Sequence, residues 1–120
     1  MSFTILGADV ATSAGFCWMR TALPPSGWRC TTAECVGKNA EEKAGDLAFW
    51  LFAELARDPV DFAAVEMPQR SVQPYEKSHT DPETGDKSVK ATINPNALQL
   101  SALAGAVVAA LEIRGIPWGL

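Results

Sequence analysis

The alternation of apolar runs with turn residues predicts that the chain begins with three strands. Residues 3–10, 16–22 and 28–36 are each apolar enough to form a strand, and short segments rich in small residues or proline separate them. These short connections predict an antiparallel meander. Residues 61–66 and 116–120 have the same strand-like character later in the chain. We therefore expect five strands in one sheet.

Two longer segments have the pattern of helices. Asn39, followed three residues later by Glu42, is typical of a capped helix start, and this helix should end near Arg57. Its apolar stripe has helical spacing: Ala44, Leu47, Ala48, Leu51 and Leu55. The strand after such a crossover helix should lie parallel to the first strand. A second helix is expected from Asn94-Pro95 to about Arg114.

The second predicted helix carries apolar or small side chains on almost every side. This pattern predicts that the helix is covered on two sides, by the sheet and by either a further element or a second subunit. Residues 68–95, just before it, are polar and contain four prolines. A long polar loop is expected there, either solvated and mobile or serving as a flap that faces a substrate.

Composition places the 120-residue chain among ordinary single-domain globular proteins, with 48% hydrophobic and 20% charged residues. The formal net charge of −4 argues against a simple electrostatic nucleic-acid binder. We find no signal peptide and no apolar run long enough to span a membrane. Cys17, Cys30 and Cys35 do not have zinc-site spacing, and we expect them to be reduced core thiols of a cytoplasmic protein.

Two acidic residues end otherwise apolar strands. Asp9 closes the first strand, and Glu66 closes the strand after the first helix. A carboxylate near a core is costly unless it is paired or binds a cation. On neighbouring strands the two could hold divalent metal, and metals about 3.5–4 Å apart are a common device for cutting phosphodiesters. The simpler alternative is that each acid merely ends its strand in water.

Three segments resemble one known family in the right order. Residues 7–16, from Gly7-Ala8-Asp9 to Phe16, resemble the first strand and turn of RuvC-type Holliday-junction resolvases. Val65-Glu66-Met67-Pro68-Gln69 resembles the second acidic strand of that family. Residues 96–117 resemble the helix that follows it. The resemblance covers most of the chain apart from residues 70–93.

This resemblance implies an α/β, ribonuclease H-like fold, with a three-stranded antiparallel meander, parallel strands and flanking helices in a single domain over residues 1–120. It also implies a metal-dependent crossover-junction endonuclease that acts on branched DNA as a homodimer. Asp9 and Glu66 match the first two catalytic positions and would ligate Mg²⁺ or Mn²⁺. Such a protein would be cytoplasmic and encoded by a bacterium or a phage.

The sequence departs from the family pattern in two places. Val10-Ala11 follows the first acid, where many relatives have Pro-Gly or Pro-Ser. The last helix of the family, which brings its third and fourth acids, is also absent. The domain is therefore expected to be C-terminally incomplete, and such a truncation could leave it inactive. Glu112 is the last acidic residue and is expected to be a surface residue rather than a substitute ligand.

Five further residues are candidates for DNA contact. Thr12 and Ser13 could bind a phosphate, although ordinary turn hydrogen bonding is the simpler explanation. Arg70 follows the second acid and could contact the scissile strand. Lys87 and Lys90 could follow the DNA backbone, and each of these three cations could instead be solvated.

Two other functions are compatible with the sequence. A catalytically inactive DNA-binding or assembly module of the same fold would suit the negative charge and the missing third acid. An actin-like phosphotransferase fragment is the other alternative, because Asp9 with Thr12-Ser13 resembles a phosphate-binding hairpin of that related fold. That alternative also needs a second glycine-rich phosphate loop, which the sequence does not contain.

Overall fold

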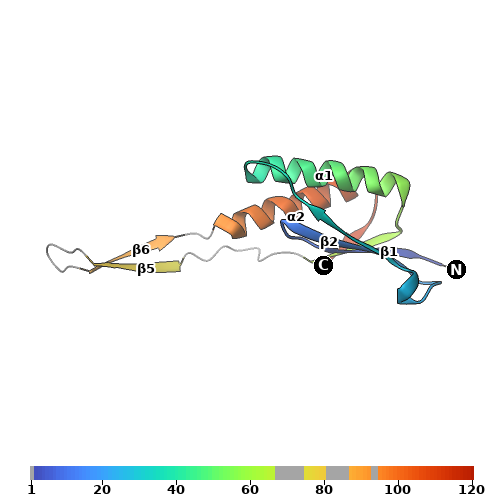
Figure 1. Cartoon of the computed structure of the whole chain (residues 1–120), viewed down its shortest axis with the longest axis horizontal. Coiled ribbons are helices and arrows are strands. Elements are labelled where there is room, and N and C mark those ends of the chain that lie inside the picture. Colours follow the sequence, from blue (N-terminus) through green and yellow to red (C-terminus); the bar gives the residue numbers. More distant parts are fainter. Residues whose placement is uncertain (1, 67–74, 81–86, 93–94) are drawn as a thin grey trace.

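The computed structural model describes residues 2–66, 75–80, 87–92 and 95–120 (Figure 1). Seven strands, two α-helices and one short 3-10 helix, η1, make up these ranges. In chain order they are β1 (Thr4–Asp9), β2 (Ser13–Arg20), η1 (Pro25–Gly27), β3 (Arg29–Glu34), α1 (Ala40–Arg57), β4 (Phe62–Glu66), β5 (Tyr75–Thr80), β6 (Lys87–Thr92), α2 (Pro95–Ile113) and β7 (Trp118–Gly119).

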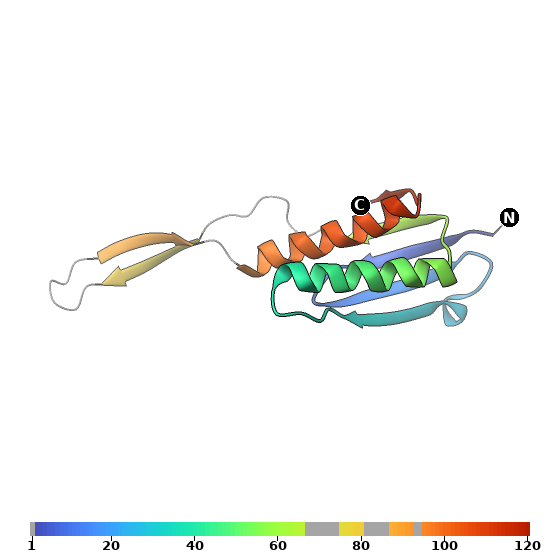
Figure 2. The same cartoon turned by 90° about the horizontal axis from the view of Figure 1, so that it is seen from above.

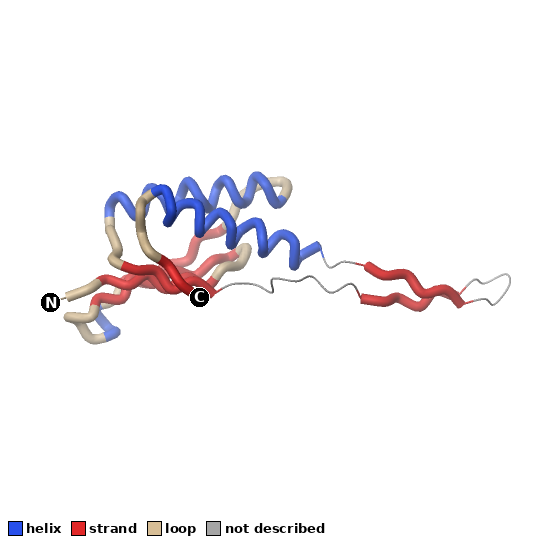
Figure 3. Tube along the Cα trace, turned by 180° about the vertical axis from the view of Figure 1, so that it is seen from behind, coloured by secondary structure: helices blue, strands red, loops and turns tan. Residues whose placement is uncertain are grey.

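Five of the strands form one sheet in the order β3-β2-β1-β4-β7. The first three are antiparallel neighbours, which confirms the predicted meander. Strand β4 lies parallel to β1, as the crossover helix predicted, and β7 lies parallel to β4. Both α-helices lie side by side over one face of this sheet (Figures 2 and 3). Within the described ranges, the opposite face carries no α-helix.

Helix α1 begins where its sequence predicts. The Asn39 side chain accepts a hydrogen bond of 2.8 Å from the Glu42 backbone N–H, and the Glu42 carboxylate accepts one of 2.6 Å from the Lys38 N–H. These two bonds satisfy donors that a helix start leaves unpaired. The stripe that the helix buries includes Leu47, Leu51 and Leu55.

The core lies between the helices and the side of the sheet that they cover. Residues at every second position of β1, β2 and β4 face the helices, as strand geometry requires. The largest fully buried side chains are Trp18, Phe16, Leu6, Leu47, Leu51, Leu103, Leu111, Val65 and Val107. This face therefore provides most of the apolar burial that stabilises the domain.

Ion pairs link the end of α1 to β2 and β3. Asp58, the C-cap, forms ion pairs with Arg20 at 2.7 Å and with Arg29 at 3.1 Å. Arg29 also pairs with the buried Glu54 at 3.3 Å and lies 3.8 Å above the Trp18 ring centroid. The Trp18 indole N–H donates to the Asp58 carbonyl at 2.8 Å. Because these groups are partly shielded from water, removing one partner would leave the other poorly compensated and would weaken the attachment of α1.

Helix α2 obtains its second side of cover from α1. The two helices pack along each other, and the sheet-facing side of α2 buries Leu103, Val107 and Leu111. No additional element or second subunit is therefore needed to bury these two sides of α2. The remaining outward side includes Gly105 and Ala109, both exposed.

The prediction of one long loop over residues 68–95 is wrong in part. Strands β5 and β6 pair antiparallel within it, from Tyr75 opposite Thr92 to Thr80 opposite Lys87. They form a separate two-stranded sheet, which Figure 1 shows beyond the start of α2. The loop prediction failed because these segments lack the apolar alternation that identifies a strand with a buried face.

We predict that Gly105→Ala stabilises the protein by about 0.8–1 kcal/mol, because alanine is the better helix former. A Cβ atom at this exposed position would meet no atom within 4 Å. The matched control is Gly37→Ala, whose Cβ would lie 2.6 Å from the Glu42 Cβ and should destabilise the fold. Urea unfolding measures both changes. A Gly105→Ala protein less stable than the wild type would show that this side of α2 is tightly covered in solution.

Candidate functional site

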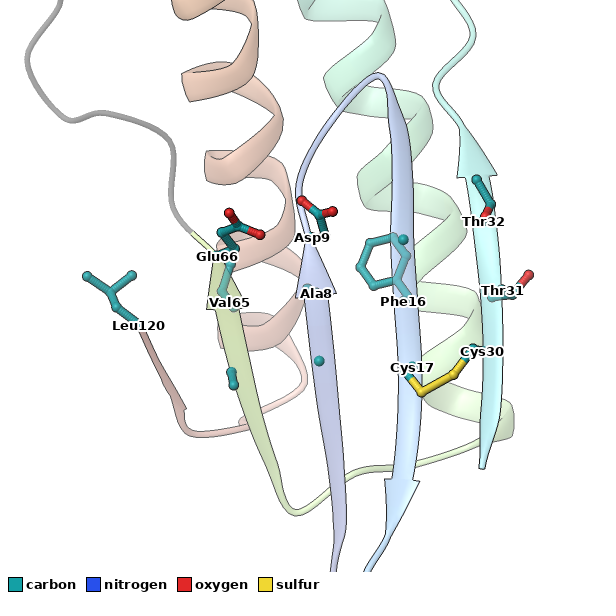
Figure 4. Close-up of a pocket in the computed structure, with 13 residues that line it drawn as sticks. Ala8, Asp9, Phe16, Cys17, Cys30, Thr31, Thr32, Val65, Glu66 and Leu120 are labelled. Carbon is teal, nitrogen blue, oxygen red and sulfur yellow. A yellow bond between two sulfur atoms is a disulfide. The ribbon is translucent and has the colours of Figure 1, made fainter. Parts of the chain in front are cut away.

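The parallel pairing of β1 with β4 brings the two predicted acids together. Asp9 and Glu66 are direct partners at the last position of this register. Neighbouring strands lie about 4.8 Å apart, so the two carboxylates can reach a common ion. Figure 4 shows both side chains at the same end of the sheet, above the face that the helices leave open.

Both acids are exposed and available as ligands. Among the described residues, no cationic side chain forms a salt bridge with Asp9 or Glu66, and no donor forms a hydrogen bond with either carboxylate. Two carboxylates without a compensating charge make a donor set of hard oxygens. This donor set fits Mg²⁺ or Mn²⁺ in chemistry.

The acids stand at the rim of a concavity of about 690 Å³ on the open face. Its floor is low at Gly15, which has no side chain, whereas the Met19 methyl group lies 3.1 Å from where a Gly7 Cβ would stand. A Cβ atom on Gly15 would contact the Asp9 Cβ at 3.9 Å, so glycine there leaves one flank of the acid open. The open-face residues that line the concavity are Gly7, Asp9, Gly15, Cys17, Cys30, Thr32, Ala64, Glu66 and Leu120.

The prediction of three reduced core thiols is wrong for two of the cysteines. Cys17 on β2 is directly opposite Cys30 on β3, and the two form a disulfide that lines the concavity (Figure 4). Cys35 is the free cysteine and is half-buried. The expected strands 16–22 and 28–36 centre the turn at residue 25 and place residue 17 opposite residue 33, so they did not reveal the pair. The observed register is centred between residues 23 and 24 and brings the two cysteines together.

The structure does not bring the other predicted DNA contacts into the concavity. Ser13 begins β2, and its hydroxyl donates a 2.6 Å hydrogen bond to Glu34. Thr12 lies in the preceding turn, where its carbonyl accepts from the Cys35 N–H at 2.9 Å. Neither residue lines the concavity. Lys87 and Lys90 lie on β6, in the separate hairpin, and Arg70 lies outside the described residues.

A third acidic ligand is not found in the part of the chain that the structure describes. No group of three or more His, Cys, Asp or Glu side chains there could hold a metal ion. Glu112 instead accepts a 2.9 Å hydrogen bond from the Trp118 indole N–H, which ties α2 to β7. The two-carboxylate set is still sufficient for Mg²⁺, which is usually bound by one or two carboxylates together with water and substrate phosphate.

Comparison with solved structures identifies the fold. The chain superposes on T. thermophilus RuvC in complex with a Holliday junction substrate with a TM-score of 0.61 and 16% identity, over 97% of this chain and 62% of that one. It superposes on a second Thermus thermophilus RuvC structure with a TM-score of 0.53 and 16% identity, over 98% of this chain and 59% of that one.

These matches show a RuvC-like, ribonuclease H-like α/β fold, as the sequence predicted. No protein-family model matches the chain, and no curated protein sequence matches it. The chain spans about three fifths of the length of the RuvC structures, 62% and 59%. Of the helices described, none is long and apolar enough to cross a membrane.

We predict that Mn²⁺ binds at Asp9 and Glu66. Electron paramagnetic resonance of free Mn²⁺ should show affinity falling roughly tenfold or more, at least about 1.4 kcal/mol, in Asp9→Asn and in Glu66→Gln. Glu41→Gln is the matched control, because it removes the same charge from the exposed first turn of α1. Equal affinities in the wild type and both site variants would exclude these acids as the metal site.

We also predict that Cys35 reacts slowly with alkylating reagents at neutral pH. Burial raises the pKa of its thiol, and the nearby Asp46 and Glu34 carboxylates raise it further, whereas Lys43 lowers it. The reactive thiolate is therefore scarce below the raised pKa. Alkylation of the disulfide-bonded protein at pH 7, followed by mass spectrometry, should be slower than for a free cysteine. A rate equal to that of free cysteine would contradict this prediction.

Proposed function

We propose that this chain is the core of a metal-dependent endonuclease of the Holliday-junction-resolvase type that acts on branched DNA. The observation that carries the proposal is the pairing of Asp9 with Glu66 at the open end of a RuvC-like sheet. The fold alone is compatible with many functions, so the argument depends on the site. A metal site that cuts phosphodiesters first needs acids close together. The two acids here lie in register, and no described residue forms a salt bridge with either of them.

The residues of the site would act through position and charge. Asp9 and Glu66 would hold Mg²⁺ or Mn²⁺, and the bound metal would supply Lewis-acid stabilisation of charge at the scissile phosphate. The β1–β4 register fixes the separation of the two carboxylates without relying on a loop. Gly15 and Ala64 keep the adjoining floor low, so a DNA backbone can approach the acids closely.

One solved neighbour supports the proposed substrate. It is the structure of RuvC in complex with a Holliday junction substrate. We propose by analogy that this chain binds branched DNA as a homodimer in the cytoplasm, each subunit placing one pair of acids at one strand. Contacts to DNA from Thr12, Ser13, Arg70, Lys87 and Lys90 are part of this proposal.

A second candidate is a DNA-binding or assembly module that does not cut. One observation favours it: in the described ranges only two acids converge, and no third potential ligand joins them. Such a module would recognise branched DNA through the same open face. The two candidates differ in whether metal bound at the acids leads to strand cleavage.

We predict that the chain cleaves a synthetic four-way junction in Mg²⁺ or Mn²⁺. Asp9→Asn and Glu66→Gln should each lower the cleavage rate at least about a hundredfold, or about 2.7 kcal/mol, because each removes a metal ligand. Glu41→Gln should cleave like the wild type. The measurement is product formation on a denaturing gel, with junction binding followed separately by gel shift.

The outcomes separate the candidates. Junction binding by the wild type without any cleavage would favour the non-cutting module. Equal cleavage by the wild type and both site variants would show that these acids do not catalyse the reaction.

A further inference from the structure

The Cys17–Cys30 disulfide lies on the exposed side of the sheet. Figure 4 shows the bond in the concavity below the two acids, on the face without a helix. Cys30 is exposed, whereas Cys17 is half-buried. A small thiol in solution can therefore reach the bond, most directly at the Cys30 sulfur. Disulfides that only stabilise a core are protected from such attack.

Strand register places the disulfide close to the acids. Cys17 is the direct partner of Gly7, which precedes Asp9 by two residues on the same strand. Two residues along a strand span about 7 Å, and neighbouring strands are about 5 Å apart. The Cys17 and Asp9 backbones are therefore separated by roughly 8–9 Å, measured diagonally across the floor of the concavity.

We propose that Cys17 and Cys30 form a thiol–disulfide exchange site for small cellular thiols of the glutathione type, and that the adduct occupies the concavity beside Asp9. The exchange chemistry is independent of the proposed nuclease function. Only the consequence for DNA binding rests on that function. In compartments rich in thiols, exposed disulfides are characteristically transient and regulatory rather than structural.

The exchange proceeds in two steps. A glutathione thiolate attacks the Cys30 sulfur, a bond forms between these two sulfurs, and the Cys17–Cys30 bond breaks. The electron pair of the broken bond stays on the Cys17 sulfur, which leaves as a thiolate and takes a proton from water. A second glutathione thiolate then attacks the sulfur of the first glutathione, giving the Cys17, Cys30 dithiol and oxidised glutathione.

The adduct is large enough to cover the floor beside the acids. Cys30 lies one strand beyond Cys17, so its backbone is roughly 12 Å from that of Asp9. Glutathione is joined through its central residue, and a tripeptide spans about 10 Å when extended, so one arm of the adduct extends over Gly15 toward Asp9. Gly15 has no side chain to stop it. A mixed disulfide on Cys30 would therefore lie in the space that the proposed DNA backbone needs, whereas the closed disulfide leaves that space open.

The first test uses the wild-type protein in mixtures of reduced and oxidised glutathione. Intact mass spectrometry should detect a species carrying one glutathione and, at higher reduced glutathione, the dithiol. In two-dimensional NMR spectra, the amide signals of Gly7, Gly15 and Ala64 should shift when the adduct forms. A disulfide that stays intact in millimolar reduced glutathione, or an adduct that leaves these three signals unmoved, would overturn the proposal.

A matched pair of variants tests which sulfur is attacked. Cys17→Ser/Cys35→Ser leaves only the exposed Cys30 thiol, and Cys30→Ser/Cys35→Ser leaves only the half-buried Cys17 thiol. With oxidised glutathione, the first should form its adduct at least tenfold faster than the second. Equal rates of adduct formation in the two variants would show that Cys30 is not the preferred site of attack. The wild-type measurement does not depend on whether these variants fold.

A DNA-binding measurement then separates this proposal from the proposed function. Fluorescence anisotropy with a four-way junction should show at least tenfold weaker binding by the Cys30 adduct than by the disulfide-bonded protein. If the disulfide-bonded protein binds no junction, the proposed function fails, while the mass and NMR results still decide the exchange site. If the adduct binds the junction as tightly as the disulfide form, the adduct does not occupy the DNA-binding space and that part of the proposal is wrong.

Discussion

The pairing of β1 with β4 is the constraint on which the candidate site depends. These strands are far apart in sequence, and their parallel register from Ile5 opposite Phe62 to Asp9 opposite Glu66 is what makes the two acids neighbours. A shift of one residue would turn one acid toward the covered face, because strand side chains alternate between the two sides of a sheet. The apolar partners Leu6, Ala63 and Val65, all buried beneath the helices, prevent that shift.

The two faces of the sheet therefore differ in role: one contains the core and the other the candidate site. The helix-covered face contains the core and the ion pairs that fasten α1 through Asp58. The open face holds Asp9, Glu66 and the Cys17–Cys30 disulfide around a shallow floor. In the part of the chain that the structure describes, no α-helix covers this second face, so an apolar floor lies open beside the two acids. That feature gives a substrate or a thiol direct access to the site.

Much of the fold could be predicted from sequence because the signals were local. Asn39 capped the first helix as expected, and the apolar run ending at Glu66 became a central strand. The disulfide and the β5–β6 hairpin were missed for a different reason. Both depend on antiparallel register between polar or thiol-bearing segments, for which apolar periodicity gives little information. The acids could be proposed from sequence, but their adjacency required the β1–β4 register.

The separation of the two faces also explains why the candidate chemistry can be altered without unfolding the domain. Asp9 and Glu66 are exposed, and no described residue stabilises either carboxylate by a salt bridge. Replacing one of them by its amide therefore removes no core contact, and it reduces repulsion between neighbouring charges. A loss of metal binding or cleavage in such variants can then be attributed to the site itself. By contrast, Glu54 is buried against Arg29, so a change there would affect the attachment of α1 to the sheet and hence the fold.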